Sequence, residues 1–432
     1  MIDPHLNDLR PTTYDLRPMT FATRLRLIPT LLLAACATRD TQSTRVDSAP
    51  ERWVSTAAAS TRDTSAMVVY DIPASAYDQA PRVVLSAAPV TTVSGRDFTG
   101  DLARAFRVLL LHDGRLVFFL DGSLFVLGPD GKEVERIGRS GAGPAEFMDG
   151  VIVRGLGDTI LVHDRTNGRL SFVVPGKGVV RMRPLSPAVL QRFTGVVGQY
   201  ADDAMLVASE GFGISAEPGR PTMNPWLSAR LPAGSDRLEI LDSVAGPTIV
   251  WHEGHATPLQ YGVYPIAVAW GSEFLISDGQ HWSLERVAAT GAVQARYRLP
   301  IRRRAVEASK READDRIRIA EIRARALRNP GTVDTTNVFS SVRDAPSGDS
   351  LQVIAKVLIG ADSIAWIKDG GYRQADARWG WTALRRDGTI LGRLVGTGKD
   401  PVVAFGANRV MLKSEDEDGF VTLRVHTLTV GR

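Results

Sequence analysis

Six short apolar segments, spread along the chain, constrain most strongly what this sequence can fold into. Each is a run of mainly apolar residues that ends at an acidic residue, and they occupy 115–121, 159–164, 204–210, 273–278, 363–369 and 409–415. Asp121 and Asp164 are 43 residues apart, and the next acidic end, Glu210, follows after 46. A spacing of about 40–50 residues is typical of a four-stranded unit repeated around a ring.

Two of the intervals are longer, 68 residues from Glu210 to Asp278 and 91 from Asp278 to Asp369. The first holds the proline-rich stretch 211–237, which predicts a long loop on one rim. The second holds 302–347, in which a helix is expected from about 305 to 328 because apolar residues recur three and four positions apart. This helix is rich in arginine, so it is either a docking surface for an anionic partner or a solvated helix packed on the ring.

The segments themselves indicate an all-β chain. Their nearly continuous apolar character suits strands that are covered on both faces, as in stacked sheets. Hairpin signals separate them, for example Asp113-Gly114, Asp130-Gly131, Asn167-Gly168 and Asp387-Gly388. A strand at about 83–93 would complete the last unit and join the two ends of the ring.

Two motifs add a family resemblance to this pattern. The residues concerned are Gly138, Gly141, Gly143, Pro144, Glu146 and Phe147 in the first, and Asp164, Asn167 and Arg169 in the second. The first resembles the GxGPxEF junction of NHL-type propellers, and the second resembles their DxxNxRL element. The resemblance, which includes bacterial lipoprotein propellers with a helical insertion, implies a six-bladed β-propeller over 81–432. Asp164 is either a ligand residue or, as its recurrence favours, a cap of its turn.

The N-terminal stretch predicts export. Basic Arg24 and Arg26 precede a short apolar region, 27–35, which is too short to span a bilayer as a helix. It ends in Leu33-Ala34-Ala35-Cys36, which resembles a lipobox and implies cleavage before a lipid-bearing Cys36; the alternative is an ordinary signal peptide. We therefore expect a signal peptide at 1–35, with Met19 as an alternative start that would make 1–18 an extension. A lipidated tether at 36–80 follows, and the location is the bacterial cell envelope, periplasmic or outer-membrane.

Composition excludes several classes of function. A net charge of +4 on 432 residues gives no reason to expect a nucleic-acid partner. Cys36 is the single cysteine, so a disulfide within the chain is impossible. The sequence contains no GxSxG elbow, Walker-type loop or dinucleotide fingerprint, which leaves serine-hydrolase and nucleotide-binding functions without support.

The densest group of possible ligand residues is Trp251, His252, Glu253 and His255, with Trp270 nearby. The spacing is not that of a helical metal motif, and the stretch is expected to be a loop, so no metal site is assigned. The aromatic residues either line a ligand surface or pack between sheets. Two functions stay open: a monomeric, membrane-anchored binding module for a protein, peptide or glycan, without a cofactor, and a calcium-dependent propeller hydrolase of the lactonase or esterase type.

Overall fold

The computed structural model describes residues 67–431 apart from ten short gaps. These gaps are 99, 106, 193–194, 210–220, 253–254, 280, 302–303, 329–341, 371–377 and 398–400. Contacts divide the chain into units at 1–51 and 52–432, and all described residues belong to the second, whose fold follows. The predicted signal peptide, Cys36 and most of the predicted tether lie outside the described residues.

Antiparallel meanders, in which each strand pairs with the next along the chain, account for most of this fold. The first three meanders are β4 Val108–Leu110, β5 Leu116–Leu120, β6 Ser123–Leu127 and β7 Glu133–Ile137; β8 Gly150–Arg154, β9 Ile160–Asp164, β10 Arg169–Val174 and β11 Gly178–Pro184; and β12 Gly195–Gln199, β13 Met205–Ala208, β14 Thr222–Leu231 and β15 Glu239–His252, extended by β16 His255–Pro258. The others are β17 Ile266–Trp270, β18 Glu273–Ser277, β19 Ser283–Ala288 and β20 Val293–Arg298; β21 Ile354–Ile359, β22 Ala365–Asp369, β23 Arg378–Leu384 and β24 Ile390–Thr397; and β25 Val402–Gly406, β26 Arg409–Glu415 and β27 Val421–Val430.

The six apolar segments of the sequence are confirmed as strands. They form β5, β9, β13, β18, β22 and β26, which are the second strands of the successive meanders. Every residue of β9 and of β13 is buried. The strands are covered on both faces, as their continuous apolar character predicts.

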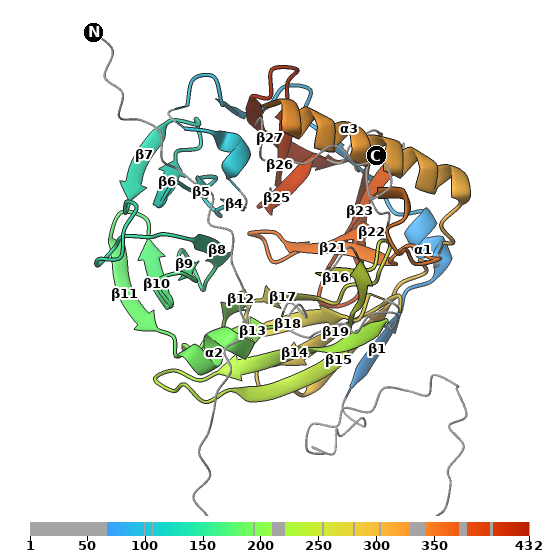
Figure 1. Ribbon diagram of the computed structural model, residues 1–432, viewed down its shortest axis with the longest axis horizontal. Helices are drawn as coiled ribbons and strands as arrows, with labels where there is room; N and C mark the ends of the chain where they lie inside the picture. Colours follow the sequence, from blue (N-terminus) through green and yellow to red (C-terminus); the bar gives the residue numbers. More distant parts are fainter. Residues whose placement is uncertain are drawn as a thin grey trace, which may run out of the picture. The chain divides into compact units, whose positions relative to one another are not determined.

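The meanders close into a ring. Their first strands contact one another in turn, from β4 through β8, β12, β17, β21 and β25 back to β4, and Figure 1 shows these strands nearest the middle. The core lies between neighbouring meanders: Leu124 and Ile160 belong to one apolar cluster between the first two, and Leu110 and Met411 belong to another where the last meander returns to the first. Sheets stacked side by side around an axis make a β-propeller.

An early segment joins the beginning and the end of the ring, as the sequence predicts, but it forms two short strands where one strand at about 83–93 is expected. β2 (Arg82–Leu85) pairs with the second half of β27 and also, in parallel, with β24. β3 (Thr91–Ser94) pairs with the first half of β27. Because β2 bridges β24 and β27, the last two meanders share one nine-stranded sheet.

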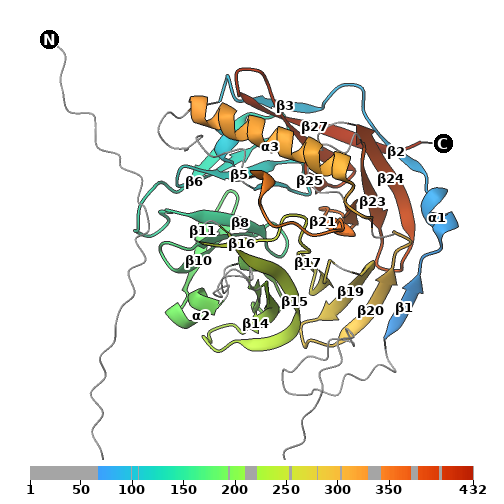
Figure 2. The same cartoon turned by 45° about the vertical axis from the view of Figure 1, so that its right-hand side comes forward.

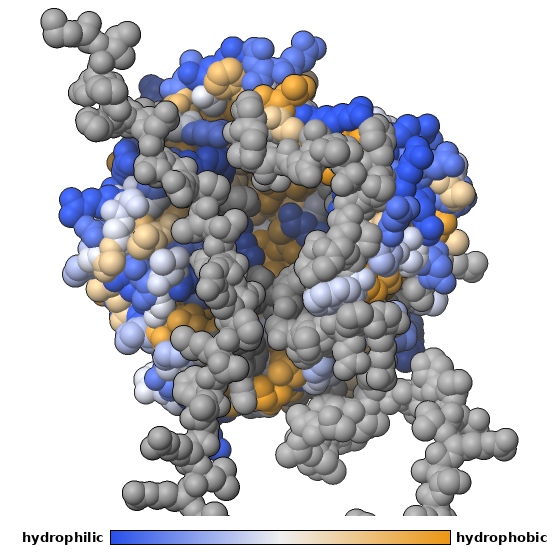
Figure 3. All heavy atoms as spheres, in the orientation of Figure 1, coloured by the Kyte–Doolittle hydropathy of each residue, from blue (hydrophilic) through white to orange (hydrophobic). Residues whose placement is uncertain are grey.

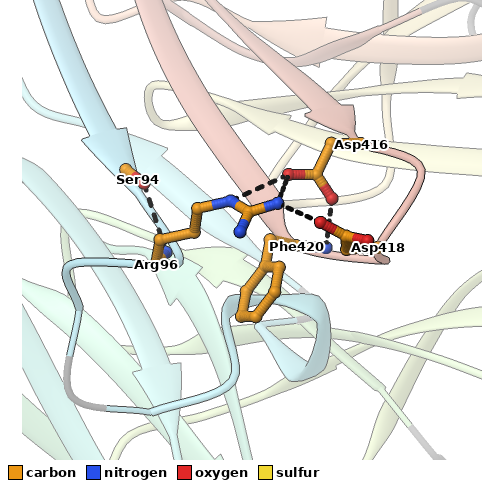
Figure 4. A network of polar contacts seen from close by, with 5 residues as sticks. All are labelled: Ser94, Arg96, Asp416, Asp418 and Phe420. Atoms are coloured by element: carbon orange, nitrogen blue, oxygen red, sulfur yellow. Dashed lines mark hydrogen bonds and ion pairs between the residues drawn. The ribbon is translucent and has the colours of Figure 1, made fainter.

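A side-chain clamp reinforces this closure just after β3 (Figure 4). The guanidinium of Arg96 donates to Asp416, with the closer nitrogen at 2.9 Å, and also to Asp418. It lies 4.4 Å from the ring centre of Phe420, and Ser94 accepts a hydrogen bond from the Arg96 backbone. All of these groups belong to the β3 end or to the β26–β27 turn, so the clamp joins an early segment to the last hairpin.

Secondary structure begins earlier than the sequence predicts. β1 (Val68–Asp71) pairs in parallel with β20, the last strand of its meander, and so becomes the edge strand of that sheet; α1 (Ala74–Asp78) follows it. Tyr77 of α1 donates a hydrogen bond of 2.6 Å to Asp369 of β22, and Arg393 of β24 binds the same carboxylate at 2.7 Å. Residues 68–80 fall within the predicted tether, but β1 and α1 pack on the ring.

The predicted helical insertion is confirmed as α3 (Ala308–Arg328), which crosses the β23 and β27 side of the ring in Figures 1 and 2. Its buried side is not the expected stripe, because Leu327 is exposed whereas Asp314, Asp315 and Ile319 are buried. Tyr261 explains the difference, since its hydroxyl donates to Asp314 over 2.7 Å and draws that polar face inward.

The proline-rich insertion differs from its prediction in part. Residues 210–220 lie outside the described part, but Pro225 and Trp226 belong to β14 and not to a loop. The strand tolerates Pro225 because its pairing with β15 shifts between Met223 and Pro225, which is where a missing N–H does least harm. Two further short helices are α2 (Pro187–Arg192) and a 3-10 turn, η2 (Leu102–Arg104). No helix in the described ranges is long and apolar enough to cross a membrane.

Candidate functional site

The two sequence motifs bind each other. The first forms the connection from β7 to β8, and the second forms the turn between β9 and β10. Arg169 donates to the backbone oxygens of Ala142 and Gly143 at 3.0 and 2.7 Å, and also to that of Glu146. Asn167 donates to the oxygen of Gly141 over 2.9 Å.

Within the first motif, a carboxylate and a glycine set the path of the chain. The Glu146 carboxylate accepts from the Gly143 backbone at 2.7 Å and from Arg139 at 2.7 Å, and the Gly143 contact followed by that of Arg139 lowers the pKa of Glu146. Pro144 lies between Gly143 and Glu146 in the sequence. Gly138 has a φ of 84°, and a β-carbon there would lie 2.4 Å from the buried ring of Phe147. The position therefore requires glycine.

Asp164 is a cap, as the recurrence of acidic residues at such turns favours. Its carboxylate is fully buried and accepts hydrogen bonds from the backbone of Met148, Asp149 and Asn167 and from the Asn167 side chain, over 2.7–3.2 Å. It thereby fixes the start of β8. Asp278 also caps, since it accepts from the His281 backbone at 2.9 Å. Asp369 is an exception, because it binds Tyr77 and Arg393.

The predicted ligand cluster does not lie in a loop. Trp251 and His252 end β15, His255 begins β16, and the backbones of the two histidines are paired in the register of these strands. Glu253 lies outside the described residues. The Trp251 side chain is 41% exposed. The loop interpretation failed because β15 continues for 14 residues, well beyond the other strands of its sheet.

Trp270 differs from Trp251 because its side chain is buried. It ends β17, has no exposed surface, and donates from its indole nitrogen to the backbone oxygen of Ser363 at 2.7 Å. Arg386 lies over its ring at 5.2 Å. These contacts belong to the packing between two meanders.

A pocket of about 340 Å³ opens at the end of the ring where the two motifs meet. Its walls come from the end of β5 and the following turn, the start of β8, the end of β9 and the start of β12. The apolar lining includes Phe119, Leu120, Val151, Ile152 and Val196, and Met148 is half exposed there. Since Asp164 holds the Met148 and Asp149 backbone, the sequence motifs build one wall of this pocket without contacting its interior.

His163 is the most unusual residue of the lining. It lies on β9 opposite Val151, is 2% exposed, and its Nε2 atom is buried without a hydrogen-bond partner. Burial, with a smaller effect of nearby Arg165, lowers the pKa of His163 from 6.5 to about 4, so the ring is neutral at pH 7. A buried polar atom that lacks a partner has a cost in free energy of about 1–3 kcal/mol.

The charged residues at this pocket include two ion pairs. Arg104 contacts Asp121 at 2.7 Å and Arg165 contacts Asp149 at 2.9 Å, while Arg107 also lines the pocket. Asp121 adopts a φ of 47° in its two-residue hairpin beside Gly122, so the turn directs it to this rim.

The innermost strands of the ring carry fewer charged side chains than the pocket. The six innermost strands consist almost entirely of valine, isoleucine, leucine, alanine and glycine, with Arg154, Gln199 and Lys356 as their charged or amide residues. Figure 3 shows orange, apolar residues with a few blue ones inside the central hollow. Calcium prefers several carboxylate oxygens, which these strands lack. Among the described residues, no three His, Cys, Asp or Glu side chains lie close enough to hold a metal ion.

Sequence reasoning considered the end of the 159–164 segment but selected Asp164 and passed over His163. The available signal was a histidine inside a strand of mainly apolar, buried residues. Burial of a polar ring in such a strand has a cost in free energy unless the ring is hydrogen-bonded. The arginines of the rim carried no signal, because they come from two connections that are far apart in the sequence, β3 to β4 and β9 to β10.

Comparison with known proteins gives structural matches alone. No family model and no curated protein matches the sequence. A member of the DUF4221 family from Bacteroides vulgatus is similar in structure, with 10% identity, a TM-score of 0.45, and coverage of 82% of this chain and 100% of that one. A gluconolactonase from Xanthomonas campestris has 11% identity, a TM-score of 0.37, and coverage of 80% and 95%.

Virginiamycin B lyase from Staphylococcus aureus is also similar, with 11% identity, a TM-score of 0.33, and coverage of 79% of this chain and 88% of that one. All three scores are below 0.5. The assignment to the β-propeller class therefore rests on the strand pairing and the ring of contacts in the chain itself.

Proposed function

We propose that this chain is an exported, lipid-anchored six-bladed β-propeller that acts as a binding module. The observation that supports binding is the pocket at the motif end of the ring, which combines an apolar lining with a few charged side chains, three arginines and two aspartates. Such a combination is typical of small-ligand sites, whose volumes run from about 300 to 1,000 Å³. A side chain of a protein or peptide, or part of a glycan, is of a size to enter it.

The anchor is proposed from the N-terminal sequence. Cys36 follows a short apolar region and a basic stretch, the arrangement of a lipoprotein signal. Replacing Cys36 with serine is expected to move the protein from the membrane fraction to the soluble fraction. Unchanged membrane association, with no lipid on the N-terminal peptide by mass spectrometry, would contradict the anchor.

The absence of calcium donors from the described innermost strands supports binding over hydrolysis. The test is to measure bound metal in the purified chain and to assay lactone and ester hydrolysis with and without a chelator. We expect no chelator-sensitive turnover. Stoichiometric calcium together with turnover that the chelator abolishes would replace the binding proposal by the hydrolase.

The exposed Trp251 at the end of β15 is proposed as a contact for a larger partner of the same module. Aromatic side chains with a large exposed area are frequent at protein and glycan interfaces. This contact is separate from the pocket and is tested by replacing Trp251 with alanine once a partner is known.

A further inference from the structure

Three apolar side chains of the described pocket lining keep an accessible surface. Phe119 and Val151 are half-buried, and Met148 is 53% exposed. The other apolar side chains of the lining are almost fully buried. The apolar part of a ligand therefore contacts chiefly the ring of Phe119, the thioether of Met148 and the methyl groups of Val151.

The ring of Phe119 is held in place by two contacts. A β-carbon at Gly150 would lie 2.6 Å from this ring, so the backbone of Gly150 lies directly against it. The fully buried ring of Phe147 meets it edge to face, with the ring centres 5.9 Å apart. Because the ring is oriented before a ligand arrives, little of the free energy of binding is spent on ordering it.

The accessible groups of the pocket favour an aromatic ring over an aliphatic group. A second ring gains edge-to-face or offset contacts with Phe119, and a thioether such as that of Met148 makes favourable contacts with ring edges. Guanidinium groups lie over ring faces, and Arg104 and Arg165 line the pocket.

An arginine that is already ion-paired can still cover an aromatic ring in this chain. The guanidinium of Arg181 lies 3.7 Å from the ring centre of Phe172 and at the same time contacts Asp203 at 2.8 Å. The ion pairs at the pocket therefore leave their arginines able to contact a ring.

The charges of the pocket give no reason to expect a charged ligand. Arg104 contacts Asp121 at 2.7 Å and Arg165 contacts Asp149 at 2.9 Å. Arg107, the third arginine of the lining, also interacts with another residue. Each charged side chain of the described lining thus has a partner within the chain.

The two titratable residues behind this lining add no group that a ligand would meet. The carboxylate of Asp164 is fully buried and accepts four hydrogen bonds. His163 is neutral at pH 7, and its Nε2 atom is buried. Recognition in this pocket therefore depends on its accessible apolar groups and on the paired arginines.

We propose that this pocket binds an uncharged aromatic ring, which contacts the ring of Phe119 and the thioether of Met148 and lies next to the ion-paired Arg104 and Arg165. This inference rests on the proposed function and names the ligand class of its pocket. The ring belongs either to a small molecule or to a side chain of a peptide.

Four small probe compounds test this ligand class. 2-Phenylethanol carries an uncharged ring, 2-cyclohexylethanol is its saturated counterpart, and phenylacetate and 2-phenylethylammonium carry the ring with a charge of either sign. We expect the full-length chain to bind 2-phenylethanol at one site with a dissociation constant on the order of 1 mM. Binding of 2-cyclohexylethanol should be about threefold to tenfold weaker, because contacts between rings add to the burial of apolar area. Neither charged compound should bind more tightly than 2-phenylethanol, even at low salt.

Isothermal titration and ligand-observed NMR measure these affinities. A fifth probe, N-acetylphenylalaninamide, presents the same ring as a peptide side chain. Tighter binding of this probe than of 2-phenylethanol would support a peptide as the source of the ring, and weaker binding would support a small molecule.

Two pairs of variants locate the binding. Phe119→Leu keeps an apolar side chain but removes the ring, so the affinity for 2-phenylethanol should fall about threefold to tenfold and the preference over 2-cyclohexylethanol should disappear. Its matched control is Phe420→Leu, whose exposed ring belongs to the clamp around Arg96, outside the pocket. Met148→Gln removes an exposed thioether without a cost to the core and should lower the affinity about twofold to threefold. Its matched control is Met182→Gln, on the exposed side of β11. Both controls should bind as the native chain does.

The outcomes are distinct. If 2-phenylethanol fails to bind, or if 2-cyclohexylethanol binds as tightly, the preference for an aromatic ring is wrong. If a charged compound binds more tightly than 2-phenylethanol, the ligand is not uncharged and the inference fails. Unchanged binding in both Phe119→Leu and Met148→Gln would show that the ring does not bind in this pocket. None of these results touches the anchor or the hydrolysis tests, which decide the proposed function separately.

Discussion

Replacing Asp164 should lower the free energy of unfolding more than replacing most other residues of the ring. The change to asparagine tests how the hydrogen bonds of Asp164 hold the two motifs together. One carboxylate oxygen accepts from the backbone of Asp149 and Asn167, each at 3.2 Å. The other accepts from the Met148 backbone at 3.0 Å and from the Asn167 amide at 2.7 Å. Whichever way the new amide is turned, its NH₂ group faces two donors.

The magnitude follows from this geometry. Two hydrogen bonds to a charged acceptor are lost, and each is worth about 1.5–3 kcal/mol, so the free energy of unfolding should fall by roughly 4 kcal/mol. A ring of roughly 350 residues unfolds with an entropy of about 0.7 kcal/mol per kelvin, which makes the expected fall in Tm about 5 °C. Because Asp164 is fully buried, water cannot replace the lost partners.

The assay compares thermal unfolding and amide hydrogen exchange in the native chain, Asp164→Asn and a control, Asp387→Asn. Asp387 also caps a turn, through the Thr389 backbone at 2.9 Å, but it is exposed, so its replacement should change Tm little. Exchange should accelerate at the Met148 and Asp149 amides in the first variant. If both variants melt within about 1 °C of the native chain, Asp164 does not stabilise the junction and the reasoning fails.

Three further predictions concern other parts of the ring. Tyr77→Phe removes the hydroxyl that donates to the mostly buried Asp369, so unfolding free energy should fall by about 1.5–3 kcal/mol in chemical denaturation; no change would show that α1 does not stabilise the ring. Arg169→Lys should destabilise by about 1–3 kcal/mol, since one ammonium cannot reach three backbone oxygens, and an unchanged midpoint would refute this. In the folded chain, His163 is protonated only near pH 4, whereas the unfolded chain binds this proton below pH 6.5. The free energy of unfolding should therefore fall by about 2 kcal/mol between pH 7 and 4.5. This pH-dependent fall should be absent in His163→Phe. Equal pH dependence of the two proteins would contradict it.

The architecture was largely predictable because it depends on a local signal that is repeated. Each apolar segment is a strand buried on both faces, and such strands are recognisable one at a time. The helix at 308–328 was also recognisable, but its buried side was not. Asp314 turns inward because Tyr261, 53 residues away in sequence, supplies a hydrogen bond that no periodicity reveals.

The stretches around Trp226 and Trp251 were assigned to loops for a related reason. Proline at 225 and glycine at 254 are strong turn signals in isolation. In the ring, β14 and β15 pair over a long antiparallel stretch, and a shift of register between Met223 and Pro225 accommodates the proline. Pairing between strands thus overrides the local preference.

The sequence by itself determined the ring. The spacing of six apolar segments, the glycine junction and the turn motif after Asp164 are local in sequence, and each specifies a strand or a turn wherever it occurs. The tertiary structure alone decided the pocket, because its lining comes from β5, β8, β9 and β12 and from connections that are far apart in the chain. Whether His163 has a partner, and which charges surround it, depends on how those strands come together, and strand patterns contain no information about that.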